Sequence, residues 1–263
     1  MTRLQLHTGS LTLPFCVDFD LLLPECPYDA DPADYYTGDN RLPVLFLLHG
    51  GGASGAEWPR FSRIEEMAQA KNLAVVCPSM QNSDYTNMYR GYPWLDWLTG
   101  ELYDYVHAVF PLSRDREKNF VAGQSMGGYG ALQCALLHPE RFSCAGLLSS
   151  GVGLIDQVAG HSAVQSGGPA SDKIFASFGP AETLYGGPND SYHLAVELAQ
   201  SGRPLPRFFS ACGTEDHCYP GNVKLRDILR ENGYDLTWRE GPGAHTWDFW
   251  HQYMPEFLNW LPL

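Results

Sequence analysis

The sequence predicts an α/β fold in which a mostly parallel central sheet is covered by helices on both faces. Short apolar runs recur without polar alternation, which is typical of strands buried on both faces. Segments with helical spacing separate them, and this alternation of strands and helices favours parallel pairing. The chain of 263 residues suits one large domain, so we expect a single domain over 1–263.

The expected elements follow in chain order. Two edge segments, Arg3–Thr8 and Leu11–Leu23, partly alternate apolar and polar residues, and a polar loop over Pro24–Asn40 follows. Continuous or nearly continuous apolar runs predict strands at Leu42–Leu48, Leu73–Cys77, Asn119–Ala122, Cys144–Ser149 and Arg207–Cys212. A further strand is expected over Leu236–Arg239. Helical spacing predicts helices over Trp58–Ala70, Trp94–Phe110, Met126–Leu137, Asn222–Asn232 and Trp247–Trp260.

Residues 151–190 interrupt this alternation. The segment is rich in glycine, serine and proline, as in Gln165–Pro169. Long segments of this composition lie outside the sheet and often carry function. We therefore expect an insertion, which is either a lid over the active site or a passive surface loop.

The charge balance excludes several classes of partner. The chain has 30 acidic and 17 basic residues, a formal net charge of −13, which repels nucleic-acid phosphates and anionic lipid headgroups. We expect no nucleic-acid or membrane partner. Residues 1–30 hold no apolar run as long as a signal-peptide core, and the seven cysteines stand mostly in apolar contexts. These features favour reduced, buried thiols in a cytoplasmic protein.

The strongest chemical signal is Gly123–Gly127 (G-Q-S-M-G), which follows a strand and opens a helix. There, a Gly-x-Ser-x-Gly sequence forms a nucleophile elbow, because its glycines make room for a sharp turn around a strained serine. We predict that Ser125 is the nucleophile. The backbone N–H of Met126, at the helix N-terminus, would face an oxyanion. The alternative is a chance glycine-rich turn before a helix.

A second glycine-rich segment, His49–Gly52 (H-G-G-G), directly follows an apolar strand. Consecutive glycines leave backbone N–H groups unshielded, and this motif supplies the second oxyanion donor in many esterases and lipases. We assign that donor to the Gly51 amide, with Gly52 as the neighbour that fits the same pattern. The competing interpretation is a flexible connection between strand and helix. The His49 side chain is expected to be a packed, hydrogen-bonded support.

A nucleophile elbow requires an acid and then a histidine, each after a later strand. The loop after the strand Arg207–Cys212 offers two adjacent candidate acids, Asp216 and Glu215, which spacing does not separate, and both could instead be solvated loop residues; the family resemblance given below favours Asp216. The predicted base is His245, which lies in a glycine-rich loop 29 residues after Asp216 (245 − 216). The other nearby histidines fit less well, because His217 is next to the acid and His251 falls inside the last helix. The order serine, aspartate, histidine is that of the α/β-hydrolase fold.

With these motifs the sequence resembles the esterase D branch of the α/β-hydrolases, and within it the bacterial tributyrin and acetyl esterases related to feruloyl esterases. The resemblance spans most of the chain and rests on the segments Leu47–Gly50, Ala122–Ala131, Cys212–Asp216 and Gly243–Trp250. It implies a serine esterase that hydrolyses short acyl esters, including O-acetyl or feruloyl groups on carbohydrates, without a cofactor. It also suggests that Trp58 and Tyr85 border the acyl or alcohol pocket, with core or surface packing as the alternative for both rings.

Two departures from the family pattern affect this interpretation. S-formylglutathione hydrolases of this branch usually carry S-G-L-T-C at the oxyanion loop and a histidine after the Gly-Gly pair, where this chain has His49–Ala53 and Tyr129. That thioesterase activity is therefore disfavoured. Relatives also usually carry a bulky pair such as Phe-Leu after the acid, where this chain has His217–Cys218. With Cys212 these residues lack a fourth ligand, so we expect no metal.

Two other functions stay open at this point. An acyltransferase of the same fold, as in the mycolyltransferases, would pass the acyl group to a sugar hydroxyl instead of water. A catalytically inactive binding module would keep only the scaffold, although the complete set of catalytic motifs disfavours it. Whether the protein forms a homo-oligomer is not determined by the sequence.

Overall fold

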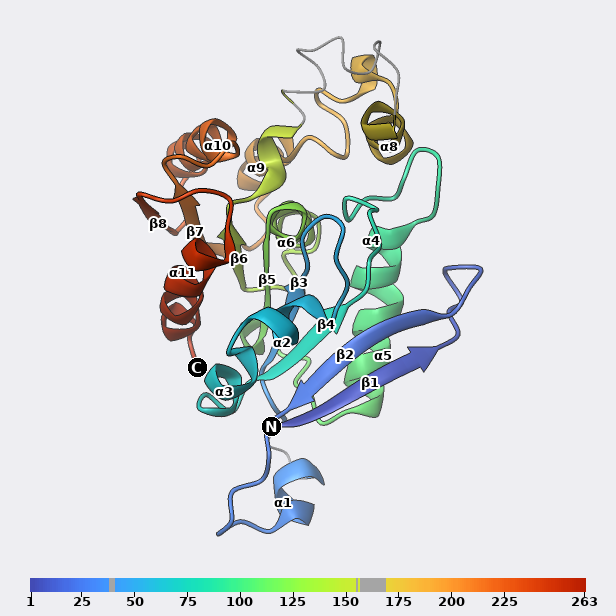
Figure 1. The fold of residues 1–263 in the computed structure, drawn as a ribbon, viewed down its shortest axis with the longest axis vertical. Coiled ribbons are helices and arrows are strands. Elements are labelled where there is room, and N and C mark those ends of the chain that lie inside the picture. Colours follow the sequence, from blue (N-terminus) through green and yellow to red (C-terminus); the bar gives the residue numbers. More distant parts are fainter. Residues whose placement is uncertain (38–40, 155, 157–168) are drawn as a thin grey trace.

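The computed structural model describes residues 1–37, 41–154, 156 and 169–263. Within these residues eight strands form one sheet in the order β1-β2-β4-β3-β5-β6-β7-β8 (Figure 1). The strands are β1 Thr2–Thr8, β2 Val17–Leu23, β3 Val44–Leu48, β4 Ala74–Pro78, β5 Asn119–Gln124, β6 Cys144–Leu148, β7 Arg207–Gly213 and β8 Leu236–Gly241.

The sheet is parallel from β4 to β8 and antiparallel at its β1–β2 edge. β1 pairs antiparallel with β2, and β2 pairs antiparallel with β4. Every residue of the central strands β3, β4, β5 and β6 is buried, which explains their continuous apolar runs. The parallel register brings Leu48 of β3 opposite Gly123 of β5 and Gln124 opposite Leu148 of β6. The carboxyl ends of these strands therefore meet at one edge of the sheet.

Helices cover both faces of this sheet (Figure 1). One core lies between the sheet and α4, α5, α6, α9 and α10, and the other between the sheet and α2, α3 and α11. The helices are α1 Pro32–Thr37, α2 Glu57–Phe61, α3 Ile64–Gln69, α4 Trp94–Asp96, α5 Tyr103–Val109, α6 Met126–Leu137, α8 Pro169–Phe178, α9 Ser191–Gln200, α10 Tyr219–Glu231 and α11 Trp247–Trp260, with a π-helical stretch Trp97–Leu102 between α4 and α5. The predicted fold class is confirmed.

Several boundaries differ from those expected. The helix predicted over 58–70 is two helices, because Ser62 has an extended backbone and its hydroxyl bonds to Trp58 O. The strand predicted from Leu11 begins only at Val17, since the Glu101 carboxylate accepts the N–H groups of Leu11 and Thr12 and holds that stretch in a turn. Helix α9 was not predicted from the sequence pattern, and its N-terminus is capped by the Asp190 carboxylate.

The predicted insertion 151–190 is described only in part, because residues 155 and 157–168 lie outside the described residues. Its helix α8 lies at the end of the molecule toward which the parallel strands run (Figure 1). The carbonyl oxygens of Ala176 and Ser177 accept the backbone N–H groups of Arg90 and Tyr89 at 2.8 and 3.1 Å. The insertion is therefore anchored to the loop that follows β4. Its role as a lid and the single-domain organisation stay predictions.

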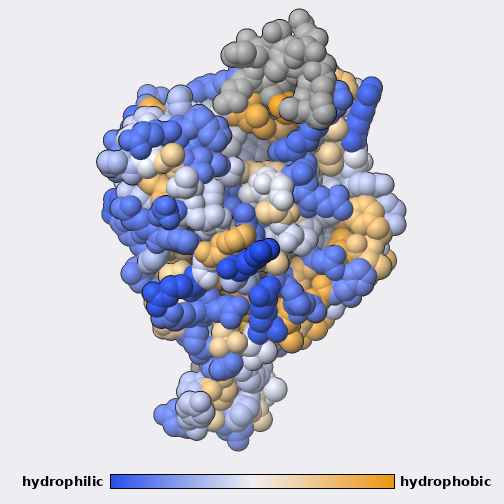
Figure 2. Space-filling view, in the orientation of Figure 1, coloured by the Kyte–Doolittle hydropathy of each residue, from blue (hydrophilic) through white to orange (hydrophobic). Residues whose placement is uncertain are grey.

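Figure 2 shows a face that is mostly hydrophilic, with hydrophobic residues gathered in separate patches. Among the described residues no helix is both long and apolar enough to cross a membrane. Five cysteines are buried, whereas Cys16 is exposed and Cys26 is partly exposed.

Candidate active site

Ser125 lies between β5 and α6 with a strained backbone. Its φ of 56° and ψ of −121° fall in a region that residues with a side chain rarely adopt. The turn is held by the Ser125 N–H, which donates to Leu148 O at 2.9 Å, and by the Gly151 N–H, which donates to Ser125 O at 2.9 Å. Strain of this kind persists only where the surroundings hold it, and it concentrates at functional sites.

The glycines around Ser125 are required by close contact with β3. A Cβ atom on Gly123 would lie 2.8 Å from Leu48 O, and one on Gly127 would lie closer still. Because backbone cannot move aside as a flexible side chain can, both positions exclude larger residues. The G-x-S-x-G pattern is thus explained by the packing of the turn against the adjacent strand.

The predicted acid and base are in contact. His245 Nδ1 lies 2.9 Å from Asp216 Oδ2 and 3.0 Å from Oδ1, on the loops after β8 and β7. Glu215 points elsewhere, because its Oε2 accepts the Gly243 N–H at 2.7 Å and so holds the loop that carries His245. The structure therefore separates two carboxylates that sequence spacing could not.

Asp216 is buried and remains an anion. Burial raises the pKa of its carboxyl, but hydrogen bonds from His245 and the Cys218 backbone N–H, together with the polar Ser149 side chain, outweigh this effect, and the pKa lies below its ordinary value. Ser149 also accepts the indole N–H of Trp250 at 3.1 Å, and Trp250 packs edge-on against the imidazole of His245. Neither Ser149 nor Trp250 was predicted from the sequence as part of the site, although Ser149 directly ends a predicted strand.

A cavity of about 580 Å³ opens above Ser125. Its wall includes Gly51 and Met126, the two predicted oxyanion donors, and His217 and Cys218 beside the acid. Among the described contacts, no hydrogen bond joins the Ser125 hydroxyl to His245. The structure therefore brings the predicted acid and base into contact, but it shows no hydrogen bond between the base and the serine. Such bonds are often long or poorly aligned before substrate binds.

The oxyanion loop distinguishes Gly51 from its neighbours. The Gly50 N–H donates to Glu57 Oε2 at 2.9 Å, and the Gly52 N–H donates to Asn82 Oδ1 at 2.7 Å. The two flanking amides are therefore occupied, and Gly51 is the member of the three that lines the cavity. This arrangement favours the Gly51 amide over that of Gly52 as the donor.

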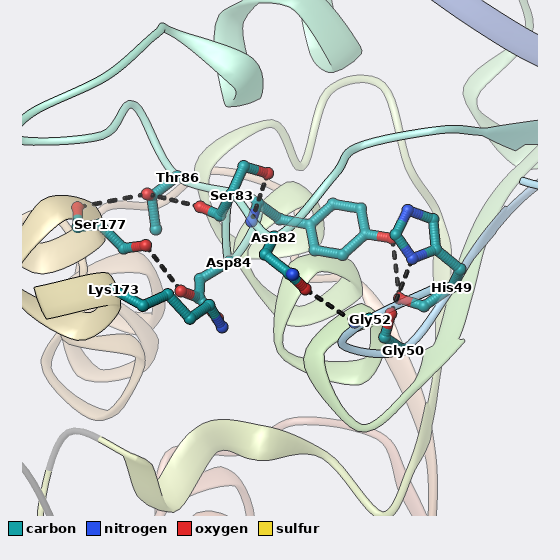
Figure 3. Close-up of polar contacts among 10 residues, drawn as sticks. His49, Gly50, Gly52, Asn82, Ser83, Asp84, Thr86, Lys173 and Ser177 are labelled. Atoms are coloured by element: carbon teal, nitrogen blue, oxygen red, sulfur yellow. Dashed lines mark hydrogen bonds and ion pairs between the residues drawn. The ribbon is translucent and has the colours of Figure 1, made fainter. Parts of the chain in front are cut away.

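Residues 82–84, which follow β4, contact the oxyanion loop through a side chain (Figure 3). Asn82 reaches Gly52, whereas Asp84, two residues later, accepts Lys173 Nζ at 2.9 Å and the Ser177 hydroxyl at 2.6 Å from α8. The same short segment thus contacts both the oxyanion loop and the insertion. Sequence reasoning missed it, because single polar residues in a loop carry no motif.

Replacing Asn82 with alanine should lower kcat of ester hydrolysis about tenfold with little change in KM. The Gly52 amide would lose its acceptor and the loop that positions Gly51 would loosen, a smaller loss than the roughly 10²–10³-fold effect of deleting an oxyanion donor. Steady-state kinetics measure the effect. Asn87→Ala is the matched control, since the Asn87 amide bonds to Asp96 and not to the oxyanion loop. Equal kinetics for the two variants would contradict the assignment.

His49 is a buried, neutral support, as the sequence analysis expected. Its Nε2 accepts the Met80 N–H at 2.9 Å, and its Nδ1 lies 2.7 Å from Gly50 O. Burial lowers the pKa of the imidazole below its ordinary value of 6.5, because the charged form would lose its hydration.

This shift predicts a loss of stability in mild acid. Below about pH 6.5 the unfolded chain binds a proton at His49 that the folded protein does not, so the free energy of unfolding falls as pH decreases, by up to about 1.4 kcal/mol per pH unit. Urea unfolding between pH 7.5 and 5.5 measures the slope, which should be smaller in His49→Gln. An imidazole of His49 that titrates in the folded protein as a free histidine does would contradict this prediction.

Trp58 and Tyr85 do not line the cavity. Both rings are fully buried. The Trp58 indole N–H donates to Leu48 O, and the Tyr85 hydroxyl donates to His49 O, each at 2.9 Å. The suggested role of Trp58 and Tyr85 as pocket walls is therefore not what the structure shows. Instead, both rings pack in the interior and their polar atoms bond to the backbone at the start of the oxyanion loop. An aromatic residue near a motif in sequence does not reveal which way its ring points.

Four potential metal ligands lie near the acid. Ligand atoms of Asp216, His217, Cys218 and His245 all fall within 4.8 Å of one another. Cys212, which the sequence analysis grouped with His217 and Cys218, does not belong to this cluster. Burial and the adjacent Asp216 carboxylate raise the pKa of the Cys218 thiol to about 12, so the thiol is neutral at neutral pH.

A mostly parallel sheet with a strained serine between a central strand and a buried helix defines an enzyme of the α/β-hydrolase class. A family model described as "Putative esterase" matches residues 30–261, and the chain belongs to this esterase family. The resemblance stated from the sequence is thereby confirmed.

Individual relatives agree with this placement. An acetyl esterase of Caldicellulosiruptor saccharolyticus is 33% identical over 84% of this chain and 84% of its own length. Two solved Staphylococcus aureus structures, one described as a fluorophosphonate-binding serine hydrolase and one as an S-formylglutathione hydrolase, are 29% identical with a TM-score of 0.85, over 99% of this chain and 98% of theirs. A diacylglycerol acyltransferase/mycolyltransferase of Mycobacterium leprae is 25% identical over 82% of this chain and 74% of its own. These similarities support an enzyme that acts on esters, as a hydrolase or an acyltransferase.

Proposed function

We propose that the protein is a serine carboxylesterase that hydrolyses short acyl esters of neutral, hydroxylated alcohols, such as O-acetyl or feruloyl groups on carbohydrates. The observation that carries the proposal is the hydrogen-bonded Asp216–His245 pair on the loops after β7 and β8, at the sheet edge where the strained Ser125 follows β5. An aspartate that orients a histidine, on loops at the same sheet edge as a nucleophile elbow, is the arrangement used for acyl transfer.

The proposed mechanism has two steps. His245 accepts the proton of the Ser125 hydroxyl as its oxygen attacks the ester carbonyl, and the Asp216 carboxylate stabilises the imidazolium that forms. The backbone N–H groups of Gly51 and Met126 hold the oxyanion. His245 returns the proton to the departing alcohol, and water then cleaves the acyl-enzyme by the same route.

The charges on the cavity wall favour a neutral alcohol. Lys173 is paired with Asp84 at 2.9 Å, and Lys224 is paired with Asp156 at 2.9 Å. Both lysines of the described wall are therefore already neutralised, and the net charge of −13 repels anions at long range. Carboxylate and ammonium groups fixed in this way offer hydrogen bonds to hydroxyl groups, as on a sugar, but little attraction for the carboxylates of glutathione.

A substrate panel tests this proposal. We expect hydrolysis of p-nitrophenyl acetate and butyrate, of acetylated xylo-oligosaccharides and of methyl ferulate, with S-formylglutathione the poorer substrate by kcat/KM. A preference for S-formylglutathione over every sugar ester would overturn the proposed substrate class while leaving the serine mechanism in place. No hydrolysis of any ester would overturn both.

The acyltransferase is the second candidate, because the mycolyltransferase relative is similar in sequence over 82% of this chain. The two functions differ only in the acceptor, which is water in one and a hydroxyl in the other. Adding glycerol or trehalose during p-nitrophenyl butyrate turnover and analysing products by mass spectrometry separates them. Acylated polyol that exceeds free butyrate would favour the acyltransferase.

A further inference from the structure

The pair that follows the acid, His217–Cys218, is not used by the proposed hydrolysis. Both residues border the cavity over Ser125. The His217 side chain is 67% exposed and its Nδ1 lies 3.5 Å from Asp216 Oδ1, whereas Cys218 is buried and its backbone N–H bonds to the same oxygen at 2.8 Å. The ring of His217 lies 4.5 Å from that of His245, centre to centre.

One thiol, two imidazoles and one carboxylate therefore lie close together. Their ligand atoms lie within 4.8 Å of one another. Zinc bonds of about 2.0–2.3 Å in tetrahedral geometry place ligand atoms roughly 3.3–3.8 Å apart, so a shift of about one ångström closes the site. The exposed His217 has room for that shift. Sulfur and imidazole ligands favour Zn²⁺ over Mg²⁺ or Ca²⁺, which prefer oxygen.

We propose that Asp216, His217, Cys218 and His245 form a reversible inhibitory Zn²⁺ site. A neutral imidazole has one free lone pair, and the ion occupies it at His245. If the ion binds Nδ1, the ring proton moves to Nε2; if it binds Nε2, that atom is blocked directly. In either case His245 cannot accept the Ser125 proton. If the ion binds Nδ1, the hydrogen bond between His245 and Asp216 is replaced by bonds of both residues to the ion. Cys218 binds as the thiolate and releases its proton to the buffer.

The inhibition by Zn²⁺ rests on the proposed hydrolytic function, whereas the binding of the ion to these four residues does not. The full-length protein is therefore titrated with CoCl₂, which replaces zinc in such sites and gives a thiolate-to-cobalt absorption band in the near ultraviolet. Cys218→Ser should abolish the band, and His217→Asn should weaken binding by about tenfold or more, since even outer-shell losses cost 10–100-fold. Cys16→Ser and His251→Asn are the controls, because neither side chain belongs to the cluster.

Inhibition is measured with ZnCl₂ against p-nitrophenyl acetate, each variant relative to its own rate without metal. We expect wild type and both control variants to lose activity and to regain it with EDTA, and the His217 and Cys218 variants to need at least about tenfold more zinc. A cobalt band that disappears in Cys16→Ser, or zinc binding without loss of activity, would overturn the proposal. An intact band in a protein that hydrolyses no ester would instead contradict the proposed function and support the metal site.

Discussion

Replacing Ser125 with alanine should lower kcat for p-nitrophenyl acetate by about 10⁴–10⁶-fold while the protein stays folded. Removal of the nucleophile eliminates the acyl-enzyme route, and the remaining rate comes from the oxyanion donors and substrate binding alone. The backbone strain at Ser125 does not change, because alanine has the same Cβ restriction at a φ of 56°. Stability should therefore differ little from that of the wild type, and circular dichroism with thermal unfolding checks this.

Ser210→Ala is the matched control for that variant. Ser210 lies in β7, and its buried hydroxyl has no hydrogen-bond partner among the described residues, so its removal should cost little stability or activity. A fluorophosphonate probe should label the wild type and Ser210→Ala but not Ser125→Ala. Labelling of Ser125→Ala at another serine, with the ester rate retained, would show that the nucleophile lies elsewhere.

The elements that the sequence predicted well are those whose burial is uniform. Each of β3 to β6 is buried along its whole length, so a continuous apolar run was sufficient to locate it. The break between α2 and α3 could not be found in this way, because it depends on one hydroxyl, that of Ser62, bonding to the preceding turn. The insertion was found by its composition, but helix α8 within it was not, since its anchoring partners follow a different strand.

In the active site, too, features set by neighbouring residues could be predicted, whereas features set by residues distant along the chain could not. Motifs predicted where Ser125 and the oxyanion loop would lie, because glycine spacing reports local backbone geometry. The choice between Gly51 and Gly52 depends on Asn82, 30 residues away along the chain (82 − 52). The directions of the Trp58 and Tyr85 rings depend on backbone carbonyls of β3 and of the residue that follows it. No pattern within a short segment contains that information.

Changing Asp216 to asparagine should lower kcat by about 10⁴-fold, the effect expected when an amide stabilises the wrong imidazole tautomer. The carboxylate accepts from His245 Nδ1 at 2.9 Å, which leaves Nε2 free to take a proton. An asparagine amide can donate to Nδ1 instead, and the proton then sits on Nε2, where it blocks the base. The lowered pKa of Asp216 keeps the wild-type carboxylate ionised at neutral pH, so the wild type does not show this defect there.

Glu215→Gln is the informative comparison, because spacing alone allowed either carboxylate to be the acid. Among the described contacts, Glu215 accepts the Gly243 N–H in the loop that carries His245, and a glutamine oxygen can accept the same bond. We therefore expect its kcat to fall by less than about tenfold, consistent with the loss of one charge-assisted hydrogen bond at an exposed position. Parallel kinetics on the two variants, with fluorophosphonate labelling rates as a second measure, decide between them. A larger loss in Glu215→Gln than in Asp216→Asn would mean that the imidazole is oriented by the other carboxylate during turnover.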